Sequence, residues 1–294
     1  MVNLNKKEKD LEKRIKAEVE PHIGKPLALS GGVDSSLLAA LLKPKFAISV
    51  ELPGGDKYNE IKWAKIVTEH LSIKHIIVRP DPSKFDEYVK LAVRSIGVPI
   101  PHFNIFPLYV MYKKLSQMGE TELILGDGPD ETMYGYARDI IINYLYKAYE
   151  LEALKNYKEL IDKVLPSMTD AIKATTGLSG FTDIVSADIE KRKEMDAMSD
   201  GIAKSFGIKN IRPYQDNPKM DNYMRDLPIA EKISGEYGKY ALRKIAEKYL
   251  PKEVAWRKKK LGGPVYPVNL MKGWMGNGEF DKKYWLDYQK KILK

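Results

Sequence analysis

The first half of the chain alternates short apolar runs with longer segments in which apolar residues recur every three or four positions. The runs predict strands and the longer segments predict helices, because these periodicities match the faces of the two elements. Strands alternating with helices at this spacing form a parallel sheet covered on both faces, with ligands at the carboxyl ends of the strands. Strands are expected at residues 25–29, within 45–54, and at 75–78 and 122–126, and helices at 33–42, 58–71, 83–96 and 106–118.

The second half of the chain is almost wholly helical in its pattern, with the longest helical stretches at residues 139–163 and 183–206. Near the N-terminus, Leu11, Ile15 and Val19 recur at helical spacing among charged residues, which predicts an amphipathic helix. The sequence contains no internal repeat and no low-complexity tract. The pattern therefore predicts an α/β region followed by a helical region.

The composition is that of a globular protein and excludes several classes of site. With 294 residues and 44% hydrophobic content, the chain can bury the core of one large domain or two smaller ones. No apolar run approaches the ~20 residues that cross a bilayer, and residues 2–10 lack the apolar core of a signal peptide. We therefore expect a cytoplasmic protein. Zero cysteines exclude disulfides and thiolate sites within this chain, and the four histidines show no paired spacing, so no zinc is expected.

A glycine turn between the first predicted strand and helix has the features of a phosphate-binding loop. Glycine lets backbone N–H groups approach an anion at the N-terminus of a helix, where the helix dipole adds attraction. A Walker loop would continue with a lysine, but no lysine follows here, and Asp34 is instead suited to hold Mg²⁺. The residues expected to contact phosphate are Ser30, Gly31, Gly32, Ser35 and Ser36.

A second glycine turn, at residues 125–131, carries three acids after the fourth predicted strand. Pro129 is well placed for the first turn of a helix, and Asp127, Asp130 and Glu131 surround it. A helix-capping role would explain one of these acids but not all three. Carboxylates at the carboxyl end of a strand can hold Mg²⁺ opposite the first loop or act as a base, so we favour a functional interpretation.

The first loop resembles the pyrophosphate loop of the N-type ATP pyrophosphatases, which split ATP between the α and β phosphates and pass AMP to a substrate oxygen. Further motifs make the resemblance more specific. The chain is similar, over most of its length, to the synthetase domain of class B asparagine synthetases and the related β-lactam synthetases. The segments that carry this resemblance are residues 30–36, 52–54, 125–136, 211–216 and 239–259.

The resemblance implies a parallel-sheet core of the adenine nucleotide alpha hydrolase-like (PP-loop ATP pyrophosphatase) fold, with ATP and Mg²⁺ as cofactors. It assigns pyrophosphate to the first loop, Mg²⁺ to Asp34 and Asp130, and the surroundings of the adenine to Val50 and Gly126. Lys239 matches the family lysine that neutralises charge building on the phosphate and acyl carbon. We expect an N-terminal amphipathic helix at 1–24, the α/β core at 25–165, and a helical carboxyl region completing the active site at 166–294.

Several departures from the family pattern affect the expected substrates and site. The asparagine synthetases start with a glutaminase domain, whereas here the first motif begins by residue 25, so we expect free ammonia, another amine or a separate amidotransferase subunit as the nitrogen source. Asp127 replaces a glutamate and carries its carboxylate about 1.5 Å further back, which leaves the carboxylate substrate open. Residues 96–103 are more apolar than the family's segment, and Arg212 is offset by one residue from the family's arginine.

Taken together, these residues predict an AMP-forming carbon–nitrogen ligase that acts on a small-molecule carboxylate and on ammonia or an amine, with Asp127 and Lys239 as catalytic residues. The net charge of +9 keeps a tRNA-modifying enzyme of the lysidine type as an alternative. A catalytically inactive ATP-binding subunit is a second alternative. The oligomeric state is left open, a homo-oligomer included.

Overall fold

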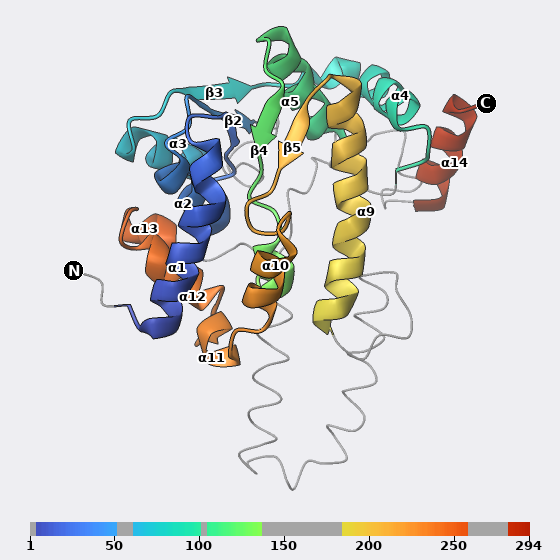
Figure 1. Cartoon of the computed structure of the whole chain (residues 1–294). Helices are drawn as coiled ribbons and strands as arrows, with labels where there is room; N and C mark the ends of the chain where they lie inside the picture. Colours follow the sequence, from blue (N-terminus) through green and yellow to red (C-terminus); the bar gives the residue numbers. More distant parts are fainter. Residues whose placement is uncertain (1–3, 52–60, 101–104, 137–183, 258–281) are drawn as a thin grey trace, which may run out of the picture.

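A five-stranded parallel sheet forms the centre of the computed structural model, which describes residues 4–51, 61–100, 105–136, 184–257 and 282–294 (Figure 1). The strand order is β3-β2-β1-β4-β5, so the chain starts at the middle strand and builds outward in both directions. The predicted α/β fold with a parallel sheet is confirmed. The strands are β1 (Leu27–Ala28), β2 (Ala47–Val50), β3 (His75–Val78), β4 (Glu122–Ile124) and β5 (Lys209–Ile211).

Helices cover both faces of this sheet, and each face has its own apolar core. Successive side chains of a strand point to opposite faces. Leu27, Ala47 and Ile124 accordingly contribute to one core, while Ile48 and Leu123 contribute to the other. Such strands are apolar on both faces, as expected of a buried parallel sheet.

The two cores are closed by different sets of helices, which lie on opposite sides of the sheet in Figure 1. The first core is covered by α1 (Lys6–Val19), α2 (Val33–Leu42), α3 (Ile61–His70), α10 (Pro218–Arg225), α12 (Tyr240–Ala246) and α13 (Lys252–Ala255). The second is covered by α4 (Phe85–Ile96), α5 (Ile105–Gln117), α9 (Ile184–Ser205) and α14 (Lys282–Ile292). No helix in the described part of the chain is both long enough and apolar enough to cross a membrane.

Several predicted elements agree closely with the structure. The helix expected at 33–42 is α2, and the stretch expected at 183–206 is α9. The predicted N-terminal amphipathic helix is α1, and its apolar positions, including Leu11, are buried in the first core. The stretch at 139–163 and the turn at 52–54 lie outside the described residues.

Two local features differ from the expectation. The helix expected at 83–96 is α4 and begins at Phe85, because Ser83 lies outside it and donates its N–H and O–H to Asp81 at 3.0 and 2.7 Å. A capping box does form at α1, between Asn5 and Glu8. The fifth strand was not predicted, and it comes from beyond residue 165, so the sheet draws on both larger predicted segments. The division into three units stays a prediction.

Candidate active site

The carboxyl ends of the parallel strands bring distant parts of the sequence to one edge of the sheet. Ser30 follows β1, Val50 ends β2, Gly126 follows β4 and Arg212 follows β5. The last two strands are tied together beyond their ends, because the N–H of Leu125 donates to the carbonyl of Ile211 at 2.9 Å. The two predicted loops therefore share the edge at which doubly wound sheets bind ligands.

The first loop leads directly into α2. Gly31 has a φ of +75°, in the left-handed region that glycine adopts without strain. The hydroxyl oxygens of Ser30 and Ser35 lie 3.0 Å apart, and the N–H of Gly32, the N-cap residue, donates to Ser30 Oγ at 3.2 Å. The hydroxyl of Ser36 is buried and has no hydrogen-bond partner among the described residues. Hydroxyl donors at the N-terminus of a ten-residue helix fit an anion such as phosphate.

The second loop packs against the first. A Cβ added at Gly126 would lie 3.0 Å from the backbone nitrogen of Ser35 and 3.1 Å from its Cα, so only glycine fits without displacing α2. The structure places Gly126 and Val50 at the predicted edge. Their assignment to the adenine stays a prediction.

Lys239 joins the two loops. Its ammonium group donates to Asp34 Oδ2 and forms an ion pair with Asp130 Oδ1 at 2.8 Å. Burial by itself would lower the pKa of Lys239, but the charges of Asp130 and Asp34 raise the pKa above its ordinary value. The lysine, which is 4% exposed, therefore keeps its proton.

An unusual backbone conformation aims Lys239 at the carboxylates. The residue follows an antiparallel hairpin of β6 (Ile233–Ser234) and β7 (Tyr237–Gly238) and is the N-cap of α12, with a φ of 56° and a ψ of 37°. Non-glycine residues rarely adopt this left-handed conformation, and when they do the strain is commonly found at functional sites. Its N–H donates to the carbonyl of Met133 at 2.9 Å, which holds the hairpin against the segment after the second loop.

Gly135 is a site residue to which sequence reasoning gave no role. A Cβ at this position would collide with Asp130 Oδ1 and with Cε of Lys239. The Met-Tyr-Gly-Tyr segment at 133–136 had been recognised only as part of the resemblance. The glycine allows the ion pair of Lys239 and Asp130 to form.

Two arginines of the carboxyl region support the same site. Arg243, 7% exposed, donates to the backbone carbonyls of Gly238 and Ala255 at 2.8 and 2.9 Å, which fixes the turn before Lys239. Arg257 donates to the carbonyl of Gly31 at 3.1 Å. The segment recognised at 239–259 therefore contacts the first loop, while Lys259 lies outside the described residues.

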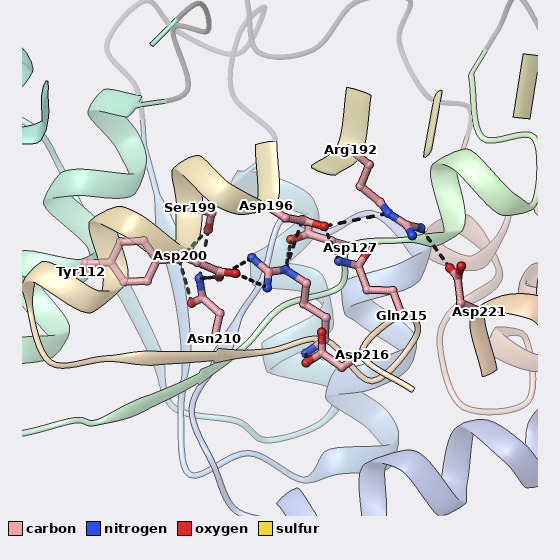
Figure 2. Close-up of polar contacts among 11 residues, drawn as sticks. Tyr112, Asp127, Arg192, Asp196, Ser199, Asp200, Asn210, Gln215, Asp216 and Asp221 are labelled. Atoms are coloured by element: carbon pink, nitrogen blue, oxygen red, sulfur yellow. Dashed lines mark hydrogen bonds and ion pairs between the residues drawn. The ribbon is translucent and has the colours of Figure 1, made fainter. Parts of the chain in front are cut away.

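Asp127 forms an ion pair with Arg212. Figure 2 shows Asp127 in a polar network with Asp196 and Gln215. The distance between Asp127 Oδ2 and Arg212 Nε is 3.5 Å. The side chain of Asp127 is 52% exposed, but the protein around its carboxylate displaces enough bulk water to raise its pKa to about 6, against the opposing charge of Arg212. An acid with this pKa can accept a proton near neutral pH.

The third acid of the second loop is engaged elsewhere. Glu131 accepts a hydrogen bond from the hydroxyl of Tyr136 at 2.6 Å, and burial raises its pKa to about 7. Of the three acids, only Asp130 contacts Lys239 in the described part of the structure.

Asp34 and Asp130 fit the predicted magnesium ion. Both carboxylates contact the one ammonium group of Lys239, so they converge on a single point from the two loops. Among the described residues, no group of three or more acids and histidines lies close enough to hold a metal by itself. Two carboxylates completed by phosphate and water oxygens are a usual arrangement for Mg²⁺.

Comparison with known proteins identifies the family of the chain. The profile of the family described as asparagine synthase matches residues 26–277. The chain belongs to the asparagine synthase family. The match spans both loops, the sheet and Lys239, and it confirms the family expected from the sequence motifs.

Two relatives within the asparagine synthase family show how far this chain has diverged in sequence. The chain is 26% identical over 277 residues to asparagine synthetase B (glutamine-hydrolyzing) of Escherichia coli strain K12, covering 85% of this chain and 43% of that protein. It is 25% identical over 262 residues to an asparagine synthetase (glutamine-hydrolyzing) of Asparagus officinalis, covering 79% of this chain and 37% of that protein. The chain thus spans less than half of the length of these relatives.

Proposed function

We propose that this protein is an ATP-dependent ligase that forms an amide by adenylating a carboxylate and then transferring ammonia or another amine to it. The observation that carries the proposal is the position of Lys239, whose protonated side chain lies between Asp34 of the first loop and Asp130 of the second. Family membership supports the same reaction class.

The first loop is the proposed site for the β and γ phosphates of ATP. Backbone N–H groups and serine hydroxyls at the start of α2 would donate to phosphate oxygens, aided by the helix dipole. Asp34 and Asp130 would hold Mg²⁺, which supplies positive charge that neutralises the phosphates. Val50 and Gly126 would line the adenine side of the same edge.

In the first step, an oxygen of the substrate carboxylate attacks the α-phosphorus. The bond from the α-phosphorus to the bridging oxygen breaks, and acyl-AMP and pyrophosphate form. Lys239 is buried and protonated, so its charge can stabilise the negative charge that develops in this step.

In the second step, the amine nitrogen attacks the acyl carbon and AMP leaves with the electrons of the acyl–oxygen bond. The attacking nitrogen must lose a proton, and Asp127 is the proposed acceptor, because its pKa of about 6 leaves most of its carboxylate unprotonated at neutral pH. The nitrogen source is proposed to be ammonia, another amine, or ammonia delivered by a separate amidotransferase subunit.

A product assay tests this proposal. The protein is incubated with Mg·ATP and ammonium chloride while carboxylic acids are screened, aspartate first, and pyrophosphate, AMP and ADP are quantified together. We expect AMP and pyrophosphate in equal amounts, in the presence of one acid or of a small group of acids. Formation of ADP would contradict cleavage between the α and β phosphates.

The same assay separates the two alternatives from the proposal. AMP formation that requires tRNA and falls steeply with salt would favour the tRNA-modifying enzyme. ATP binding without pyrophosphate release for any acid or RNA would favour the inactive subunit.

A further inference from the structure

Arg212 is almost fully buried and is surrounded by acids from two directions. The residue is 4% exposed and directly follows β5. Its guanidinium contacts Asp127 from the second loop and two aspartates of α9, Asp196 and Asp200. Figure 2 shows these three aspartates in one polar network. One arginine therefore links the carboxyl edge of the sheet to the helix beside it.

Asp200 fixes the plane of the guanidinium. Arg212 Nη2 donates to Asp200 Oδ1 at 2.7 Å and Nη1 donates to Oδ2 at 3.2 Å. Such a bidentate ion pair fixes the orientation of the guanidinium plane as well as its position. A lysine ammonium group would not fix an orientation in this way.

Asp200, which holds Arg212, is itself hydrogen-bonded to residues of the second core. Asn210 donates to Asp200 Oδ1 at 2.9 Å, and the hydroxyl of Tyr112 donates to Asn210 Oδ1 at 2.8 Å. Tyr112 is fully buried on α5, so this end of the network is held by the packed interior. Figure 2 shows the contacts that run from Tyr112 through Asn210 to Asp200.

On its other side, Arg212 presents Nε toward Asp127. Asp196 Oδ1 lies 3.3 Å from the same nitrogen, and Gln215 holds the other oxygen of Asp196 by a hydrogen bond of 2.7 Å. Within the described residues, the ion pair with Arg212 is the one salt bridge that Asp127 makes. The placement of the Asp127 carboxylate therefore depends on a group that is itself rigidly held.

We infer that Arg212, braced by Asp200, is the positioning residue for Asp127 in the amide-forming step. This inference rests on the proposed function. Asp127 carries its carboxylate one methylene further back than the glutamate expected from the family pattern, and proton transfer demands narrow geometry. A fixed cation beside the shorter side chain holds the carboxylate at the sheet edge.

The charges around Asp127 predict how the network acts on its protonation. Asp196 and Asp130 favour its neutral form, and Arg212 favours its charged form, while Asp200 acts through Arg212. Tyr112, on α5, has a pKa raised by burial and stays neutral. Weakening the hold of Arg212 should therefore move the acidic limb of amide formation to higher pH.

The test compares the two half-reactions in Arg212→Lys and Asp200→Asn. The first is carboxylate-dependent exchange of pyrophosphate into ATP, and the second is amide formation from ammonium over about pH 5 to pH 9. The acid is the one that gives AMP in the screen above. In both variants we expect exchange to stay within about twofold of wild type and amide formation at neutral pH to fall by about 10-fold or more. In Arg212→Lys the acidic limb should also move upward, because the cation that favours the charged form of Asp127 is displaced.

Asp10→Asn is the matched control, because it removes an aspartate–arginine pair on α1, that of Arg14 at 3.0 Å, and α1 packs on the other face of the sheet. It should leave both half-reactions and the pH profile unchanged. Asp200→Asn keeps the test decisive if Arg212→Lys does not fold. Parallel loss of both half-reactions, or an unmoved acidic limb in Arg212→Lys, would overturn the positioning role. A wild-type protein that exchanges pyrophosphate but makes no amide would instead contradict the proposed function.

Discussion

The ammonium group of Lys239 lies 2.8 Å from the carboxylate of Asp130, although the two residues are far apart in the sequence. The contact forms because Lys239, directly after the β6–β7 hairpin, has a left-handed backbone conformation that turns its side chain toward the second loop. Gly135 has no side chain and leaves room for the contact. The position of Lys239 between the two loops predicts the effects of several substitutions.

Lys239→Ala should retain ATP binding and lose the chemical step. Removing one electrostatic stabiliser commonly reduces turnover by about 10²–10³-fold, while the first loop keeps its phosphate donors. Nucleotide affinity by calorimetry and single-turnover pyrophosphate release measure the two effects separately. Lys252→Ala, an exposed lysine at the start of α13, is the control. Unchanged turnover in Lys239→Ala would remove this residue from the proposed mechanism.

Asp34→Asn and Asp130→Asn should each suppress magnesium-dependent turnover by about 100-fold or more, because loss of a ligand weakens the positive charge at the phosphates. Both substitutions keep the side-chain shape but remove one carboxylate partner of the buried Lys239, so the fold should persist with a lower thermal unfolding temperature. Pyrophosphate release measured across a magnesium titration gives the result. Glu253→Gln, at an exposed position of α13, should match wild type. Near-normal release in either aspartate variant would contradict the metal assignment.

Gly135→Ala should disrupt the site by steric conflict. The added methyl group would have to displace Asp130 or Lys239, and overpacking of this kind costs about 1–3 kcal/mol. We expect reduced thermal stability together with loss of pyrophosphate exchange. Gly119→Ala is the comparison, because its Cβ would meet no atom within 4 Å. Its only cost in stability would be the backbone strain of a positive φ at a non-glycine residue. Equal exchange activity in the two variants would show that the close approach at Gly135 has no role.

Amide formation should decline below about pH 6. The folded pKa of Asp127 is raised to about 6, so the carboxylate gains a proton as the pH falls through that value and can no longer accept one. Pyrophosphate exchange should persist to lower pH, since that step does not require this base. Asp127→Asn should abolish the difference between the two profiles. An acidic limb that coincides for both half-reactions would argue against Asp127 as the base.

Much of the fold could be predicted from the sequence, because the patterns that indicate its strands, turns and helices are local. The strand–glycine–helix pattern at 25–42 and the second turn at 125–131 define their own surroundings, and both loops lie where parallel strands would place them. The fifth strand was missed because two of its three residues, Lys209 and Asn210, are polar, so it forms no apolar run. The hairpin before Lys239 has two-residue strands and gave no periodic signal.

The candidate site was predicted where motifs carry it and missed where tertiary contact creates it. Asp34 and Asp130 were expected to meet, and they do so through Lys239. Nothing in the local pattern indicates that Asp196 and Asp200 face Arg212, because that contact depends on how α9 packs beside β5. The offset of Arg212 from the family pattern was visible in the sequence, but its partner was not.

The place of β5 in the sheet also determines which fragments of the chain can stand alone. A fragment that ends near residue 165 would leave β4 as an edge strand, with its backbone N–H and C=O groups unpaired on one side. Such an edge invites pairing with other chains, so that fragment should tend to aggregate, while a usable fragment has to extend at least through Ile211. The first loop is encoded early in the chain, but the sheet that supports it is complete only when the carboxyl region has been added.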